Sequence, residues 1–218
     1  MNWKWLRPAP WLDTRARFVA ATPRKGRLLD IGSSDGETLG HIAELRPDLR
    51  LFATDLEGRP ERYPTGCEFH RGDLQTTPLP WPDASLDAIT CMHLIEHLHD
   101  ITLLLREAAR LLKPGAEIYF ETPHPKSLKI PSPTGKSAGS FTLNFFDDAT
   151  HVRVVTTGQL AKEAEAAGLE VLRSGVSRNW LFTAAYPGLA LMPDSRKKFT
   201  SFIHWIGWSA YLIARRPK

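Results

Sequence analysis

The chain has 218 residues, of which 42% are apolar and 24% charged, and 28 basic minus 24 acidic side chains leave a formal net charge of +4. This composition is typical of one globular domain with an elaboration, and the basic excess is too small and scattered to indicate a nucleic-acid partner. Two cysteines and the lack of an apolar segment after a basic start argue against a disulfide framework and secretion, so we expect a cytoplasmic protein.

The first 23 residues form an N-terminal arm that carries Trp3, Trp5 and Trp11 among prolines. We expect this arm to pack on the domain surface, and a lid over a substrate is the alternative. Asp13 is placed to cap a short helix over residues 14–21, which stops before Pro23.

A short apolar strand at residues 28–31, a turn at 32–36 and a helix at 37–45 come next. Gly32 and Gly36 allow backbone conformations and close approaches that a Cβ atom would forbid. A strand that enters a helix through such a turn presents backbone N–H groups to a ligand at the edge of an α/β sheet.

Six further apolar runs predict strands at residues 51–55, 68–70, 86–91, 116–121, 169–173 and 210–215. An amphipathic stretch predicts a helix at 100–112, and a capping box from Thr156 to Gln159 opens another that runs to 167. Prolines and glycines make the connections at 56–67 and 122–150 irregular. The alternation predicts an α/β fold with a doubly wound, mostly parallel seven-stranded sheet, whose last two strands pair antiparallel at the edge.

The turn at 32–36 does not match the two common nucleotide-binding fingerprints. A dinucleotide site would need glycines at positions 32, 34 and 37, where Ser34 and Glu37 break the pattern. A phosphate-binding loop would need a Gly-Lys-Ser/Thr sequence after the turn, and none follows. The turn therefore indicates another ligand.

Five segments in one order resemble the class I S-adenosylmethionine-dependent methyltransferases: LLDIGSSDG, LFATDLEG, GDLQTTPLP, LDAITCMHLIEHL and REAARLLKPGAEIYFETP. The resemblance covers about residues 24–175 and the last strand, and it departs from the family at Ser34, where the middle glycine of the first motif is usual. It implies a single Rossmann-like methyltransferase domain over residues 1–218, with acceptor-side insertions at 122–150 and 179–205, and S-adenosylmethionine as the cofactor.

The resemblance also implies a cofactor site. Asp30 and the turn would hold the amino-acid end of the cofactor, Asp55 the ribose hydroxyls and Asp73 the adenine amino group. The adenine ring would lie between two leucines. The full set of cofactor-binding residues is Asp30, Gly32, Ser33, Ser34, Gly36, Asp55, Leu56, Asp73, Leu74 and Met92.

Methyl transfer to a hydroxyl needs a base that removes the acceptor proton. Four histidines near strand ends or in the insertion are candidates, and we favour His151, His93 and His97 over His124. His151 lies in LNFFDDATHVR, which resembles a stretch of methyltransferases associated with bacterial polysaccharide and glycolipid clusters. Its paired acids, Asp147 and Asp148, suit a sugar hydroxyl, or they tie the loop at the helix entry through an Asp–Arg pair.

The segment His93-Leu94-Ile95-Glu96-His97 allows three interpretations. It has the order of an inverted zinc-peptidase motif, which would need a long helix there. It resembles the cation-binding CMExxEH stretch of ubiquinone-biosynthesis O-methyltransferases. This resemblance implies that His93, Glu96 and His97 bind a metal ion. Because His93 stands where that stretch has a carboxylate, the site would favour a softer metal than magnesium. The third interpretation is that Glu96 and His97 pack and hydrogen-bond locally.

The expected function is methyl transfer from S-adenosylmethionine to a small-molecule or glycan-type acceptor at a hydroxyl. Methylation at nitrogen or carbon, or cofactor binding without catalysis, are the alternatives. Residues 180–208, which are aromatic and aliphatic with basic residues in the middle, are expected to line an acceptor pocket, touch a membrane surface, or form a helical cover or dimer face. The oligomeric state is left open.

Overall fold

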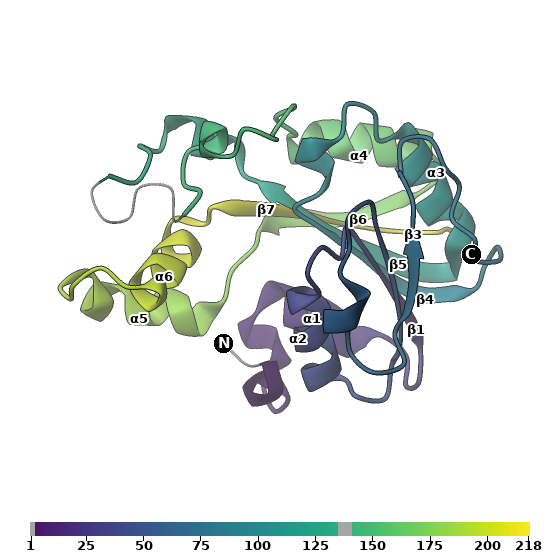
Figure 1. Cartoon of the computed structure of the whole chain (residues 1–218), viewed down its shortest axis with the longest axis horizontal. Helices are drawn as coiled ribbons and strands as arrows, with labels where there is room; N and C mark the ends of the chain where they lie inside the picture. The colour runs from purple at the N-terminus through teal and green to yellow at the C-terminus, as the bar shows by residue number, and fades with distance from the viewer. Residues whose placement is uncertain (1–2, 135–140) are drawn as a thin grey trace.

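The computed structural model describes residues 3–134 and 141–218 of the chain (Figure 1). One sheet of seven strands organises these residues, in the order β3-β2-β1-β4-β5-β7-β6. The strands are β1 (Arg27–Ile31), β2 (Arg50–Asp55), β3 (Glu68–Arg71), β4 (Leu86–Met92), β5 (Leu112–Pro123), β6 (Glu170–Val176) and β7 (Ser209–Arg215). β1 to β5 pair in parallel, and β7 runs antiparallel to both β5 and β6. The predicted Rossmann-like sheet, with its last two strands antiparallel at the edge, is confirmed.

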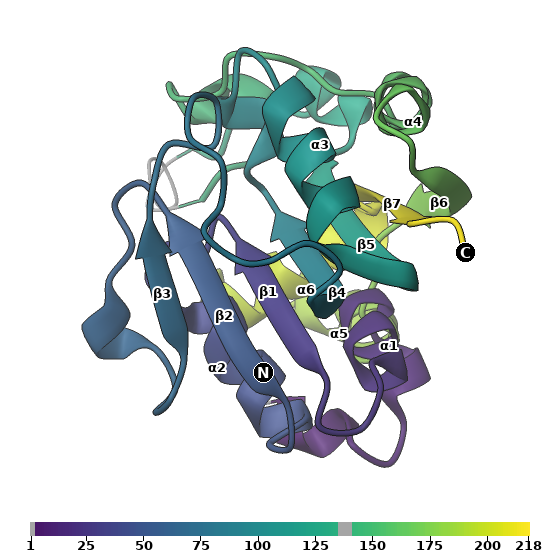
Figure 2. The same cartoon turned by 90° about the vertical axis from the view of Figure 1, so that its right-hand side faces the viewer.

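Helices cover both faces of the sheet. The helices are α1 (Thr14–Ala21), α2 (Glu37–Leu45), α3 (Thr102–Leu111), α4 (Thr157–Ala166), α5 (Trp180–Ala190) and α6 (Arg196–Ile206). Figure 2 shows α1 and α2 on one face of the sheet and α3 on the other, where Figure 1 also places α4. Each face has its own cluster of buried apolar side chains, which fixes the orientation of the strand ends that carry the polar residues discussed below.

Local sequence signals account for the helix starts. The carboxylate of Asp13 accepts from the backbone N–H groups of Arg15 and Ala16, as expected for the cap of α1. Thr156 and Gln159 form the expected capping box at the start of α4. On α3, Leu104, Leu105, Ala108 and Leu111 share the buried face, so a 3.6-residue period is what packs this helix on the sheet.

The structure shows the conformation of two segments that the sequence left open. Residues 180–206, for which a helical cover was one of the expected alternatives, form the helix pair α5 and α6, which projects beyond the sheet (Figure 1). The segment 93–98 has a single 3-10 turn, Ile95–His97, instead of the helix that a zinc-peptidase motif needs, so that interpretation is wrong. The irregular path expected for 122–150 is seen over the described residues, and 135–140 lie outside them. Within 3–134 and 141–218, no helix is long and apolar enough to cross a bilayer.

Candidate active site

The turn between β1 and α2 adopts backbone conformations that most side chains avoid. Gly32 has φ +78° and Gly36 φ +83°, both in the left-handed region. A Cβ atom on Gly36 would lie 2.5 Å from Cδ1 of Tyr63, so this position has no room for a side chain. Ser34, the departure from the family pattern, is also left-handed at φ +46°, and its carbonyl oxygen accepts from the Tyr63 hydroxyl over 2.9 Å. Tyr63 therefore helps to hold a turn that lacks the usual middle glycine.

Asp55 joins this turn to the end of β2. Its Oδ2 accepts from the backbone N–H of Ser34 over 2.9 Å, and its Oδ1 accepts from that of Glu57 over 2.8 Å. Each carboxylate oxygen has a second lone pair that is still available to a ligand hydroxyl. The residue thus fits the ribose-binding role expected from the sequence.

Asp30, at the end of β1, is 2% exposed and accepts a hydrogen bond from the Thr90 hydroxyl over 2.7 Å. Burial raises the pKa of Asp30 to about 7, against the opposing effect of the Thr90 hydrogen bond. Among the ion pairs of the described residues, none includes Asp30. A buried carboxylate without a cationic partner, next to the glycine turn, fits a ligand that carries a positive charge, as S-adenosylmethionine does.

The other expected cofactor residues differ in what they offer. Leu56 is 60% exposed, so it can cover a ring, whereas Leu74 is buried in the core cluster. Oδ1 of Asp73 accepts from the backbone N–H of Gln75 over 2.9 Å, which fixes the carboxylate close to the end of β3. Ser33 is buried and bonded to the Tyr63 hydroxyl, and Met92 packs at the end of β4.

A cavity of about 900 Å³ extends from the start of α2 to the α5–α6 pair. Glu37 and Thr38 line it at the end next to the glycine turn, and residues of α6 line it at the other end. Its wall combines charged and aromatic side chains, among them Trp3, Asp13, Arg15, His41, Glu121, Lys197 and Trp208. Trp3 of the N-terminal arm therefore forms part of the cavity wall, where it stacks on His41 at 5.5 Å between ring centroids.

Of the three favoured histidines, His93 is the one that lines this cavity. Its Nδ1 lies 3.2 Å from Oε1 of Glu96, whose side chain is fully buried, and its Nε2 lies 3.2 Å from Oε1 of Glu121 and 3.3 Å from the Ser209 hydroxyl. Burial lowers the pKa of His93, but the hydrogen bonds with Glu121 and Glu96 outweigh it and raise the pKa to about 10. At neutral pH both ring nitrogens of His93 therefore carry a proton, and the two carboxylates hold the ring in one orientation.

His97 and His151 lie together on the other side of Glu96, with ring centroids 4.8 Å apart. Nδ1 of His151 donates to the carbonyl oxygen of Phe145 over 2.7 Å. The Thr150 hydroxyl donates its hydrogen bond to Asp148, so Nδ1 of His97, 2.9 Å away, donates to the Thr150 oxygen. Both rings therefore keep the Nε2 lone pair available.

The expected metal set of His93, Glu96 and His97 does not converge. Among the described residues, the group whose ligand atoms lie within 4.8 Å of one another is Glu96, His97 and His151. The Glu96 carboxylate already bonds His93 through one oxygen and accepts from the Thr122 hydroxyl through the other. This matches the local hydrogen bonding that the sequence left open, and we assign no chemical step to a metal.

Other polar residues of the insertion are engaged in turns. Oδ2 of Asp147 accepts from the backbone N–H groups of Leu143 and Asn144, and Oδ1 of Asp148 accepts from both the N–H and the hydroxyl of Thr150. Nδ1 of His124 accepts from the N–H of Lys126. These contacts shape the loop that holds His151. Arg153 pairs instead with Glu163 of α4 over 2.8 Å, so the expected Asp–Arg pair is wrong.

Sequence reasoning missed several residues of the cavity wall, above all Glu121. Glu121 is 2% exposed, accepts from the Tyr119 hydroxyl over 2.5 Å and lies near the end of β5. An acid at the carboxyl end of a strand was the signal that identified Asp55, and it was available here as well. No comparable local signal pointed to Arg15 or Asn179, which come to the cavity through α1 and the start of α5.

A model of the family described as methyltransferase domain matches residues 3–174. The chain is 31% identical over 144 residues to the 27-O-demethylrifamycin SV methyltransferase of Amycolatopsis mediterranei, a match that covers 62% of this chain and 47% of that protein. It is 32% identical over 88 residues to a ubiquinone biosynthesis O-methyltransferase of Ralstonia nicotianae, which covers 39% and 36% of the two chains. These matched stretches span half or less of the curated relatives.

The fold is also that of phosphoethanolamine N-methyltransferase 2 from Haemonchus contortus, solved in complex with S-adenosyl-L-methionine. The two structures superpose with a TM-score of 0.60 over 93% of this chain and 51% of the other, at 15% sequence identity. At this identity the likeness concerns the architecture of the sheet and its helices.

Proposed function

Because the chain belongs to the methyltransferase domain family and is an S-adenosylmethionine-dependent methyltransferase, we propose that its acceptor is a small molecule, glycan or glycolipid methylated at a hydroxyl oxygen. When bound, the cofactor supplies an electrophilic methyl group on a positively charged sulfur. The acceptor would occupy the cavity between α2 and the α5–α6 pair.

The observation that carries the proposal is the pairing of His93 with Glu96. The buried Glu96 carboxylate holds Nδ1 of His93, so Nε2 can take a proton from an acceptor hydroxyl once its own proton has left to solvent, which the positive charge of a bound cofactor favours. Thr122 fixes the second oxygen of Glu96 and keeps the pair in place. This is the base-and-orienter arrangement that an oxygen nucleophile needs.

Charge balance supports the same assignment. In methyl transfer the acceptor oxygen forms a bond to the methyl carbon, the carbon–sulfur bond breaks, and the proton of the hydroxyl goes to Nε2 of His93. A positive charge beside the cavity before reaction favours neutral His93, because like charges repel. The positive charge then passes to the imidazole, where Glu121 and Glu96 stabilise it.

Two of the curated relatives are named for methylation at oxygen, which supports the proposal. The test is a screen with S-adenosylmethionine carrying a labelled methyl group against sugars, lipid-linked sugars and phenols, with the methylated atom located by mass spectrometry and NMR. We expect a labelled methyl ether. A product labelled at nitrogen or carbon would refute the oxygen assignment, and cofactor binding without any product would favour a non-catalytic module.

A further inference from the structure

Helix α5 exposes a face without charge. Residues 179–193 contain no Asp, Glu, Lys or Arg. The exposed side chains of this stretch recur at helical spacing and include Trp180, Leu181, Ala184, Ala185, Leu191 and Met192. A helix on the surface of a globular protein normally turns polar side chains to water, so this face is unusual.

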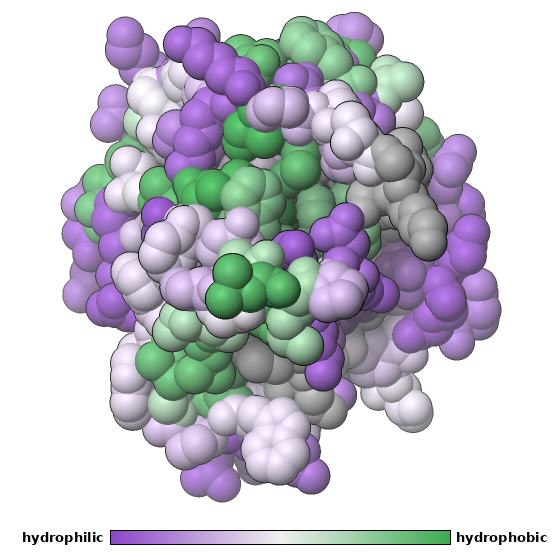
Figure 3. All heavy atoms as spheres, turned by 90° about the vertical axis from the view of Figure 1, so that its left-hand side faces the viewer, coloured by the Kyte–Doolittle hydropathy of each residue, from purple (hydrophilic) through white to green (hydrophobic). Residues whose placement is uncertain are grey.

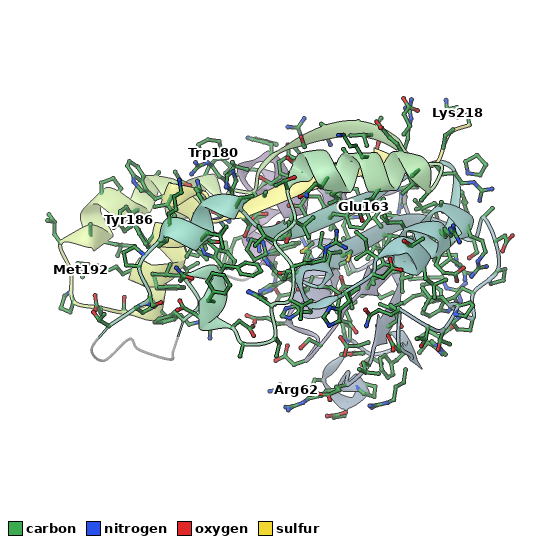
Figure 4. The ribbon with its side chains drawn as sticks, turned by 90° about the horizontal axis from the view of Figure 1, so that it is seen from above. Arg62, Glu163, Trp180, Tyr186, Met192 and Lys218 are labelled. Atoms are coloured by element: carbon green, nitrogen blue, oxygen red, sulfur yellow. The ribbon has the colours of Figure 1, made fainter. Side chains whose placement is uncertain are left out.

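The largest of these side chains are far from buried. Leu191 is 91% exposed, Met192 55%, Trp180 52% and Leu181 46%, and Trp205 on α6 adds a ring that is 48% exposed. Figure 4 places Met192 at the end of the molecule farthest from α4 and Trp180 nearer its body, with Tyr186 between them. Figure 3 views this end and shows apolar side chains gathered between polar ones. The exposed apolar side chains thus gather on one projecting element.

The charges of the segment that contains this face are mostly basic. Between residues 178 and 208 the chain carries Arg178, Arg196, Lys197 and Lys198 against one acid, Asp194, so the segment has a net charge of 4 − 1 = +3. The Arg196 side chain is 82% exposed, and its ion pair with Glu37 at 3.6 Å lies on the surface, where it is weak. A second copy of the chain would bring like charges together around the patch, whereas an anionic surface complements them.

The same helix pair forms part of the cavity. Phe182 of α5 and Lys197, Thr200 and Ile203 of α6 line it. A surface that receives the exposed side of α5 therefore lies next to the acceptor space. Trp, Leu and Met beside basic residues are the combination with which helices bind in the interfacial layer of an anionic bilayer.

We propose that the uncharged face of α5, with the turn at Leu191 and Met192, docks on an anionic lipid surface. This docking presents the cavity to an acceptor that is itself held in the lipid layer, a refinement of the acceptor class that rests on the proposed function. The docking itself does not depend on catalysis.

The test is flotation of the full chain with vesicles of phosphatidylcholine alone and of phosphatidylcholine mixed with phosphatidylglycerol. We expect binding to the anionic vesicles that falls as salt is added. The double variant Leu191→Glu and Met192→Glu should bind at least roughly tenfold more weakly. The matched control is Lys162→Glu, which makes the same change of two charges at an exposed position of α4 and should bind like the parent chain.

Calorimetry with S-adenosylmethionine on the same preparations shows that each variant is folded. Absent vesicle binding, equal loss in the Lys162→Glu control, or no preference for anionic vesicles would overturn the proposal. So would sedimentation showing a dimer that the Leu191 and Met192 changes dissociate, because a second copy would then cover the face. Vesicle binding in a chain that transfers no methyl group would refute the proposed function and leave the docking in place.

Discussion

Nε2 of His93 lies 3.2 Å from Oε1 of Glu121, and the backbone N–H of His93 donates to the carbonyl oxygen of Glu121 over 2.8 Å. The two residues come together because β4 and β5 are parallel neighbours in a register that pairs Met92 with Glu121. The sheet therefore sets the position of the imidazole through main-chain contacts. His93 itself has φ +53°, which turns the chain away from the strand and the ring toward the cavity.

Replacing His93 by Gln should lower kcat by at least about 100-fold, because the acceptor hydroxyl loses its base. The affinity for S-adenosylmethionine, measured by calorimetry, should stay within a few-fold of the parent. His99→Gln is the matched control, since His99 is exposed and lies outside the cavity. His151→Gln should lower kcat less than His93→Gln, because His151 does not line the cavity. The reverse order would return the role of base to His151, the histidine favoured from the sequence.

Asp55→Ala should weaken cofactor binding by roughly 10- to 100-fold, the equivalent of losing hydrogen bonds to a charged acceptor. The variant removes both the expected ribose contacts and the bond that holds the N–H of Ser34. Glu61→Ala, which removes the same charge from an exposed position in the same connection, should leave the affinity unchanged. Calorimetry measures both, and an unaltered affinity for Asp55→Ala would refute the ribose assignment.

Residues whose environment is set by short-range geometry were predictable from the sequence. Asp30, Gly32 and Asp55 stand at the ends of strands or in the turn that follows one, and parallel strands bring such ends to one edge. The order of strands and helices was sufficient to predict the sheet, and the capping residues Asp13 and Thr156 were sufficient to place two helix starts.

The sequence could not show how distant segments complete the cavity. Asp13 and Asn179 are 166 positions apart, and their hydrogen bond depends on how the arm and α5 pack on the finished sheet. The conformation of residues 93–98 could not be predicted from the sequence either. The i, i+3, i+4 spacing of His93, Glu96 and His97 suggests one face of a helix, whereas the backbone turns at His93 and forms a single 3-10 turn. Tyr63 likewise reaches the glycine turn from an irregular connection with no periodic signal.

Asp30→Asn should make the protein more stable above neutral pH while weakening cofactor binding. The pKa of Asp30 is about 7 in the folded chain, above its ordinary value of 3.8, so folding holds the proton and stability is lost as pH rises through about 7. The amide does not ionise, so the variant keeps the stability that the parent loses. This loss is about 1.4 kcal/mol of unfolding free energy for each unit by which folding raises the pKa. Urea denaturation at a series of pH values should show that the difference in unfolding free energy between variant and parent grows from pH 4 to pH 8. A difference that is constant with pH would contradict a raised pKa.

Removal of divalent metals should leave methyl transfer and cofactor affinity unchanged. Both oxygens of Glu96 already form hydrogen bonds, with His93 and with Thr122, so a metal at Glu96, His97 and His151 would have to displace them. The measurement compares activity before and after dialysis against a chelator, followed by titration with zinc. Tight one-to-one zinc binding that His151→Ala abolishes, together with loss of activity on chelation, would contradict this expectation.

Asn179→Ala should lower the free energy of unfolding by about 2–4 kcal/mol, because one buried side chain makes two kinds of bond. Its Nδ2 donates to Oδ2 of Asp13 over 2.9 Å, and its Oδ1 accepts from the N–H groups of Leu181 and Phe182 at the start of α5. Losing a cap costs about 1 kcal/mol, and leaving the buried Asp13 carboxylate short of a partner costs about 1–3 kcal/mol more.

The control for that change is Ser195→Ala, which removes the exposed cap of α6 and should lower the free energy of unfolding by only about 1 kcal/mol. Urea denaturation of Asp13→Ala, Asn179→Ala and the double variant forms a cycle, and the interaction energy between the two sites should be about 0.5–3 kcal/mol. Asp13 also caps α1, so the interaction energy between Asp13 and Asn179 measures how strongly α1 and the N-terminal arm are coupled to the helix pair α5–α6, which lines the cavity. An interaction energy near zero would mean that α5 is anchored independently of the arm, and that the two cavity walls move separately.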